Sequence, residues 1–285
     1  MTERTFCNRV WFTTVTLAAS LTLSSPVARG QSDASSSPSA SAATAADAAD
    51  EAGVDAVVAA LRRGDRDRAA DIAEAFLGDD PDDPQRWQLA ADASLRAGRI
   101  GRAVELYDRY AEAYPRRVPY LWQRGIALTF AGEYRRGAEQ FESHRLVNPN
   151  DVENATWHFL CVAKQATAAE ARSRLLPAPG DPRPPMKEVL ETFRSGETGP
   201  LIALLQATPD DTPSGRRARF YGFLYLAMLA DAEGKIDQAK RHLDASVAAA
   251  GNDYMGDVAR VYRQTLEGGD DAVTANESDS PGARP

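Results

Sequence analysis

The sequence predicts an all-α protein, a solenoid of stacked helical hairpins with a C-terminal helical extension. Three kinds of small or helix-ending residue recur in the same phase at intervals of 34 residues. The glycines are Gly64, Gly98 and Gly132; the prolines are Pro81, Pro115 and Pro149; the small column holds Ala69, Ala103, Gly137 and Ala171. A repeat of this length indicates a unit of two helices that cannot bury its apolar face alone and must stack on its neighbours.

Each position in the repeat has a physical role. Glycine supplies the left-handed conformation that ends the first helix of a unit. Proline cannot continue the second helix and marks the start of the next unit. Small residues allow the two helices to approach closely, and large ones fill the remaining space. The small residues are Ala91, Ala103, Gly125 and Gly137, and the large ones are Trp87, Tyr107 and Phe141.

These columns resemble the tetratricopeptide repeat, a helix–turn–helix unit of 34 residues. The second repeat, Pro84 to Arg117, matches from its early Trp87 to its closing Pro115. Repeats from Asp50 to Asp83 and from Val118 to Asp151 follow the same pattern. A degenerate fourth unit, which begins at Val152, lacks the turn glycine and has a longer, more apolar first helix. The predicted array spans residues 50–176.

A proline-rich loop, residues 177–185, interrupts the array before a second helical region at 186–267. Short helices are expected at Met186–Ser195 and Pro200–Ala207. A longer helix from Arg216 leads into a repeat-like unit near 220–253. A final helix, Tyr254 to Leu266, is expected to cap the solenoid.

The two ends of the chain are expected to lie outside the folded body. Residues 1–30 resemble a secretory signal peptide, with Arg4 and Arg9 ahead of a short apolar run and small residues at Ala28 and Gly30. An uncleaved N-terminal anchor is the alternative. Residues 31–49 are predicted to form a disordered Ser/Ala-rich linker, and residues 268–285 a disordered tail.

Charge and cysteine content limit the classes of partner and the location that the sequence predicts. The formal net charge is −8, and removal of residues 1–30, which hold three arginines and one glutamate, changes it to −10. This disfavours nucleic acid and anionic lipid. No lipid-attachment cysteine follows the apolar run, so no stable membrane anchor is expected after cleavage. The expected location is the periplasm or the outside of the cell.

The sequence offers no pattern for catalysis, for a cofactor or for a metal ion. His158 and Cys161 share a helix face and could suggest a thiol–imidazole pair. However, Cys161 falls in the column of Ala59, Ala93 and Ala127, which favours a buried, inert thiol. The acidic run Asp79–Asp83 lacks the ligand spacing of a calcium loop and favours a turn with a helix cap. We therefore predict that the protein is not an enzyme.

The repeat phase also predicts a concave binding stripe along the first helix of two units. It comprises Gln88, Asp92, Arg96, Trp122, Ile126 and Phe130. The Lys and Asn residues that grip a C-terminal carboxylate in one class of these grooves are absent. An apolar, aromatic stripe suits a helix or a hydrophobic peptide, with Trp122 as the anchor. The alternative is that the C-terminal helices or a second protomer fill the stripe.

The order of elements resembles the NlpI-type periplasmic tetratricopeptide lipoproteins, although the lipid-attachment cysteine is missing. The shared features include a helix with Trp157-His158-Phe159-Leu160 and a late repeat that opens with Phe220-Tyr221. The resemblance implies an exported scaffold or adaptor that binds other proteins, including peptidoglycan hydrolases and a protease, and that forms homodimers. A self-associating structural or assembly factor without enzyme clients is the alternative.

Overall fold

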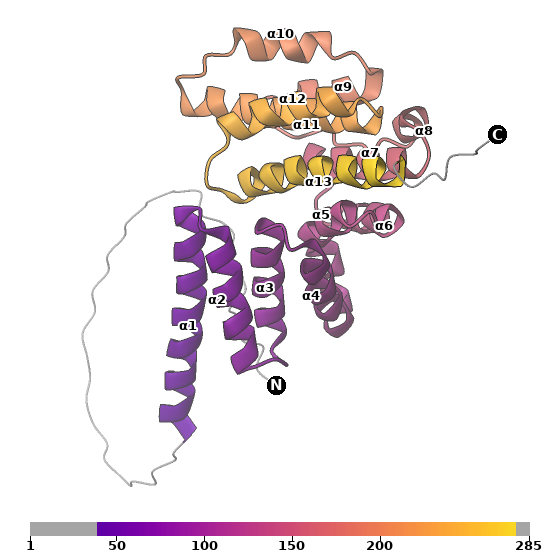
Figure 1. Cartoon of the computed structure of the whole chain (residues 1–285). Helices are drawn as coiled ribbons and strands as arrows, with labels where there is room; N and C mark the ends of the chain where they lie inside the picture. The colour runs from indigo at the N-terminus through magenta and orange to yellow at the C-terminus, as the bar shows by residue number, and fades with distance from the viewer. Residues whose placement is uncertain (1–38, 278–285) are drawn as a thin grey trace, which may run out of the picture. The chain divides into compact units, whose positions relative to one another are not determined.

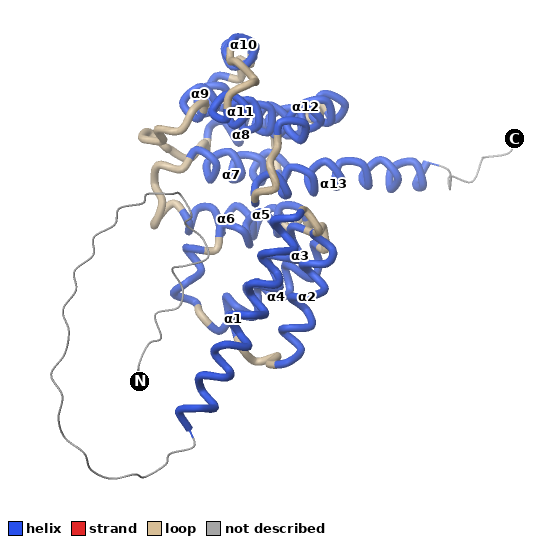
Figure 2. The backbone as a smooth tube through the Cα atoms, turned by 90° about the vertical axis from the view of Figure 1, so that its left-hand side faces the viewer, coloured by secondary structure: helices blue, strands red, loops and turns tan. Residues whose placement is uncertain are grey.

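The computed structural model describes residues 39–277, and the side chains of residues 51–267. All regular structure in this range is helical (Figures 1 and 2). The first half contains α1 (Ser39–Arg63), α2 (Arg66–Asp79), α3 (Pro84–Arg96), α4 (Ile100–Ala113), the 3-10 helix η1 (Pro115–Tyr120), α5 (Trp122–Phe130) and α6 (Tyr134–His144). The second half contains α7 (Val152–Gln165), α8 (Ala168–Ser173), α9 (Met186–Ser195), α10 (Gly199–Ala207), α11 (Pro213–Ala232), α12 (Ile236–Ala249) and α13 (Tyr254–Glu277).

Successive helices pack as antiparallel hairpins, as the 34-residue period predicts. The pairs α1/α2, α3/α4 and α5/α6 coincide with the three clear repeats, and each hairpin also packs on the next. The pair α11/α12 repeats the arrangement near the C-terminus. The all-α, tetratricopeptide-type solenoid with a helical extension is therefore confirmed.

The in-phase glycines form the turns between paired helices. Gly64, Gly98, Gly132 and Gly234 have φ values of 78°, 77°, 76° and 74°, where a Cβ atom would be strained. A backbone hydrogen bond closes each turn, such as the 2.8 Å bond that Arg99 N–H donates to the carbonyl of Ser94. This is the left-handed helix ending that the sequence predicts.

Close helix approach at small residues is confirmed in the third repeat. A Cβ atom at Gly125 would lie 2.6 Å from the ring of Phe141, so the glycine makes room for that ring. A Cβ atom at Gly137 would lie 2.9 Å from Cys161 Sγ of the following unit. Phe141 and Cys161 are both buried. Small residues on one helix thus accept large side chains from the next.

The fourth unit departs from the pattern in the way its sequence indicates. Ala166 stands where the earlier repeats have glycine, and Thr167 caps α8 by accepting a 3.1 Å hydrogen bond from the Glu170 N–H. The proline-rich loop then folds back on α7. Arg183 of this loop pairs with Asp151 at 2.9 Å and also pairs with the mostly buried carboxylate of Glu153. The loop is therefore fastened to the start of α7 by charge-assisted hydrogen bonds.

Two predicted boundaries differ from the structure. The predicted linker 31–49 is helical from Ser39, because α1 continues back through an alanine-rich stretch with high helix propensity. The predicted tail 268–285 is helical to Glu277, because α13 meets no proline before Pro281. The predicted signal peptide, 1–30, lies outside the described residues. Within 39–277, none of the helices combines the length and apolar character needed to cross a bilayer.

Candidate functional site

The predicted concave stripe is occupied by α13 of the same chain. Trp122 of α5 meets the ring of Tyr254 edge-on, with centroids 5.1 Å apart. Phe130, about two helical turns further along α5, has its ring centroid 5.5 Å from that of Tyr262. Ile126, between these two aromatics, is fully buried. The alternative in which the C-terminal helices fill the stripe is therefore the one that the structure adopts.

On α3 the same stripe makes polar contacts with α13. The buried Asp92 carboxylate accepts a hydrogen bond from the Tyr107 hydroxyl and a longer one, 3.4 Å, from the Tyr254 hydroxyl. Burial raises the pKa of Asp92 to about 7, although the hydrogen bond from Tyr107 and the charge of Arg96 act against this. Gln88, one turn earlier, is half-buried.

A buried ion cluster joins α13 to the first two repeats. The Asp257 carboxylate has no exposed surface and accepts hydrogen bonds from Arg66, Arg96 and Arg260. Arg96 Nη2 lies 2.6 Å from Asp257 Oδ2. Arg260 approaches it at 3.1 Å, and burial, aided by the charge of Arg66, lowers the pKa of Arg260. Three guanidinium groups therefore hold one carboxylate, which fixes α13 against α2 and α3.

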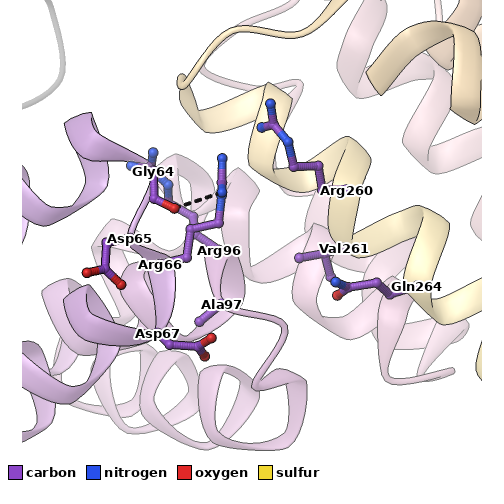
Figure 3. A pocket seen from close by; sticks show the side chains of 9 residues that line it. All are labelled: Gly64, Asp65, Arg66, Asp67, Arg96, Ala97, Arg260, Val261 and Gln264. Carbon is purple, nitrogen blue, oxygen red and sulfur yellow. Dashed lines mark hydrogen bonds between the residues drawn. The ribbon is translucent and has the colours of Figure 1, made fainter. Parts of the chain in front are cut away.

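A cavity of about 260 Å³ opens beside this cluster (Figure 3). Its lining comprises Gly64, Asp65, Arg66, Asp67, Arg96, Ala97, Arg260, Val261 and Gln264. The guanidinium groups on its wall already bind Asp257 and backbone carbonyls, including a 2.9 Å bond from Arg66 Nη1 to Gly64 O. The cavity thus lies at the edge of the contact between α13 and the first two repeats. The positive charges on its wall are already paired with groups of the chain itself.

The His158 and Cys161 side chains do not form a nucleophilic pair. Cys161 Sγ lies 3.1 Å from the Thr129 hydroxyl, and burial raises the pKa of the thiol to about 12. His158 instead places Nε2 3.1 Å from a carboxylate oxygen of Glu142, and burial lowers its pKa. A thiol with so high a pKa stays protonated near neutral pH, as the buried-thiol interpretation expects.

The acidic run between α2 and α3 acts as a turn and cap. Asp83 accepts a 2.8 Å hydrogen bond from the Gln85 N–H at the start of α3 and pairs with Arg86 at 3.6 Å. Asp79, at the end of α2, and Asp80 and Asp82, in the turn that follows, are exposed. In the range that the structure describes, no cluster of His, Cys, Asp and Glu is arranged to hold a metal ion.

Sequence reasoning missed an exposed surface at the opposite end of the hairpins from the glycine turns. We call it the inter-repeat edge and define it by the three inter-repeat segments Asp79–Asp83, Tyr114–Tyr120 and Arg145–Val147. It carries four of the five most exposed large hydrophobic side chains of the described residues, namely Tyr114, Tyr120, Leu146 and Val147. The Leu-Val pair between His144 and Pro149 was the available signal, because turns of this kind are normally polar.

Contacts between neighbouring segments keep this edge ordered. His144 Nδ1 lies 2.8 Å from the carbonyl of Pro119, and Gln140 Nε2 donates a 2.7 Å bond to the carbonyl of Val118. These bonds bring the end of α6 against η1. As a result, Leu146, which is 76% exposed, and Tyr120, which is 55% exposed, belong to one surface.

Comparisons with known proteins add little to this geometry. No protein-family model matches the chain, and no curated protein matches it. A solved tetratricopeptide repeat protein from Parabacteroides merdae ATCC 43184 is similar at 14% identity, over 82% of this chain and 80% of that chain, with a TM-score of 0.37. The repeat assignment therefore rests on this chain's own hairpins and glycine turns.

Proposed function

We propose that this chain is an exported scaffold that binds other proteins in the cell envelope. The observation that carries the proposal is the inter-repeat edge, an exposed apolar surface on a stack of helical repeats. Exposed apolar side chains that gather on one surface, with polar residues around them, are typical of protein-binding sites. Tyrosine and arginine, which flank the apolar residues here, are the residues that most often dominate binding energy in protein interfaces.

The proposed clients are envelope hydrolases and proteases, as the resemblance to the NlpI-type lipoproteins implies. Export is supported by the predicted signal peptide at residues 1–30. Because α13 fills the concave stripe, the client surface is placed on another part of the molecule. Because α13 covers Trp122 and Ile126, a client binds at the inter-repeat edge unless it displaces a helix from the core.

Affinity capture from an envelope extract tests this function. The bait is the wild-type chain, compared with a Tyr120→Ser/Leu146→Ser variant. We expect hydrolases or proteases among the proteins bound to the wild type, and their loss with the variant. The matched control is Tyr134→Phe, a change on α6 away from the edge. Recovery of no hydrolase or protease with the wild type would contradict the adaptor function.

A second function, self-association as a structural or assembly factor, is favoured by a specific observation. The inter-repeat edge carries both acidic and basic segments, so it can bind a copy of itself. Light scattering on the purified chain, combined with the affinity capture, separates the two functions, because a monomer that captures clients fits only the adaptor. A homodimer without clients fits only the assembly factor.

A further inference from the structure

We propose that the basic half of the inter-repeat edge binds an internal segment of a client protein in which apolar residues alternate with acidic ones. The basic half comprises two of the three connections, Tyr114–Tyr120 and Arg145–Val147. The inference rests on the proposed function, because it assigns a chemical character to the client segment that the edge recognises.

Two buried side chains of α6 hold the connections of the basic half together. Gln140 and His144 are 2% and 6% exposed, and they bond the carbonyls of Val118 and Pro119 in η1. The apolar side chains that follow on each connection, including Tyr120 and Leu146, are therefore fixed relative to one another before a ligand arrives. A surface that is already ordered loses little conformational entropy on binding.

The charge of the basic half is positive. Arg116 and Arg117 in η1 and Arg145 after α6 are exposed, as is Glu112 on the last turn of α4. Residues 112–120 and 145–147 thus hold three arginines and one glutamate, a formal charge of +2 (three minus one). The whole chain carries −8, so the positive charge is a local feature of this surface. A local excess of one sign favours a partner segment of the opposite sign.

Neighbouring carboxylates do not neutralise two of these arginines. Among the described residues, Arg116 and Arg145 form no ion pair. Glu142, three residues before Arg145, instead lies 3.1 Å from His158 and 3.7 Å from Arg174. An exposed guanidinium can form charge-assisted hydrogen bonds with a carboxylate of another protein. Here no ion pair within the chain has to break first.

The third arginine is placed against an aromatic ring. The guanidinium of Arg117 lies over the ring of Tyr120, 5.5 Å from its centroid. Positive charge and apolar surface are therefore adjacent at this point, so neighbouring acidic and apolar residues of one segment can contact both. Arginine and tyrosine are also among the residues that contribute most to the binding energy of protein interfaces.

Both kinds of ligand residue are needed to cover this surface. A purely apolar segment would desolvate the arginines without pairing them. The acidic run of a second copy, Asp79–Asp83, consists of aspartate and proline and has no large apolar side chain to set against Tyr120 and Leu146. The same run on this chain repels an acidic client at the other end of the edge, which restricts the client to the basic half.

Fluorescence anisotropy with synthetic peptides and the purified chain tests the proposal. The probe is a labelled peptide, amidated at its C-terminus, in which leucine and phenylalanine alternate with aspartate and glutamate. One matched peptide has lysine at the acidic positions, and another has serine at the apolar positions. We expect the probe to bind at least about tenfold more tightly than either matched peptide. Its affinity should fall as the salt concentration rises.

Variants of the chain locate the site. Arg116→Glu/Arg145→Glu should raise the dissociation constant of the probe by about tenfold, because each reversal replaces an attraction by a repulsion. Tyr120→Ser/Leu146→Ser should raise it by a similar factor through the loss of apolar contact. Arg68→Glu, the same reversal at an exposed arginine near the glycine turns, is the matched control and should leave the constant unchanged. Circular dichroism and thermal melting check that each variant is folded.

Failure of the probe to bind would overturn the proposal. Equal affinity for the lysine or the serine peptide would do the same, as would edge variants that bind the probe like the control variant. The envelope capture tests the scaffold function separately. A chain that retains hydrolases but not the probe refutes the acidic and apolar client segment and leaves the scaffold function standing. A chain that binds the probe at the edge but retains no hydrolase or protease does the reverse.

Discussion

The concave stripe lies on the second and third hairpins and the inter-repeat edge at one end of the same stack of hairpins, but the two surfaces differ in what covers them. The stripe carries Trp122, Ile126 and Phe130, which α13 covers. The edge carries Tyr120 and Leu146, which remain exposed. Aromatic and aliphatic residues in a repeat therefore do not by themselves mark a binding surface. What decides is whether another part of the chain packs on them.

The largest effect on stability is expected at Asp257, which holds α13 over the stripe. Replacement by alanine leaves Arg66, Arg96 and Arg260 without their shared carboxylate in a buried site, so Asp257→Ala should lower the free energy of unfolding by about 3–5 kcal/mol. Urea unfolding followed by circular dichroism measures the change. A loss as small as that of a surface substitution would show that α13 is not fixed by this cluster.

The next effect depends on pH and concerns Asp92. Burial raises its pKa from 3.8 to about 7, so between pH 4 and pH 7 the folded protein holds a proton that the unfolded chain releases. This contribution to stability is full at low pH and is lost as pH rises through that window. The Asn side chain of Asp92→Asn cannot titrate. The free energy of unfolding of this variant, relative to that of the wild type, should therefore rise by roughly 2–4 kcal/mol from pH 4 to pH 8.

The comparison between variant and wild type isolates Asp92 from other titrating groups. Burial lowers the pKa of His158 and of His242, so both histidines add stability as pH rises, equally in the two proteins. Glu153, with its pKa raised to about 7, also remains in both. Chemical unfolding at several pH values gives the difference. A difference that does not change with pH would refute the assignment.

A smaller loss is expected at Trp122. Its ring is half-buried and meets Tyr254 edge-on, so Trp122→Ala should cost about 2–3 kcal/mol in unfolding free energy. Tyr254→Ala should cost a similar amount, and the two losses should be less than additive because the residues share one contact. Strict additivity would mean that α13 does not rest on α5.

The smallest effect belongs to the edge. Leu146 is 76% exposed, so Leu146→Ser should change the free energy of unfolding by less than about 0.5 kcal/mol. The same change should weaken binding of the acidic and apolar peptide probe, which fluorescence anisotropy detects. A marked loss of monomer stability would mean that Leu146 is part of the core and not of a binding surface.

The sequence was sufficient for those features that depend on local chemistry. The glycine turns at Gly64, Gly98 and Gly132 follow from backbone conformation, and the boundaries of α9 and of the 34-residue hairpins follow from periodicity. The contact between Gly125 and Phe141 also followed, because size complementarity between paired helices repeats with the period. The helical stretch 39–49 was missed because low apolar content was given more weight than the helix propensity of alanine.

The occupant of the stripe could not be chosen from the sequence. Asp257 lies 161 positions from Arg96, and no periodic signal connects residues at such a separation. The edge was missed for a related reason. Whether Tyr120 or Leu146 is exposed depends on how far η1 and the end of α6 extend beyond their neighbours, which the order of residues does not specify.

The placement of α13 over the stripe depends most on Asp257. A double-mutant cycle between Arg96 and Asp257, with each replaced by alanine singly and together, tests this directly by urea unfolding. At a separation of 2.6 Å in a buried site, we predict a coupling free energy of about 1–3 kcal/mol. A coupling free energy indistinguishable from zero would contradict this role of Asp257. The stripe would then be accessible to a binding partner.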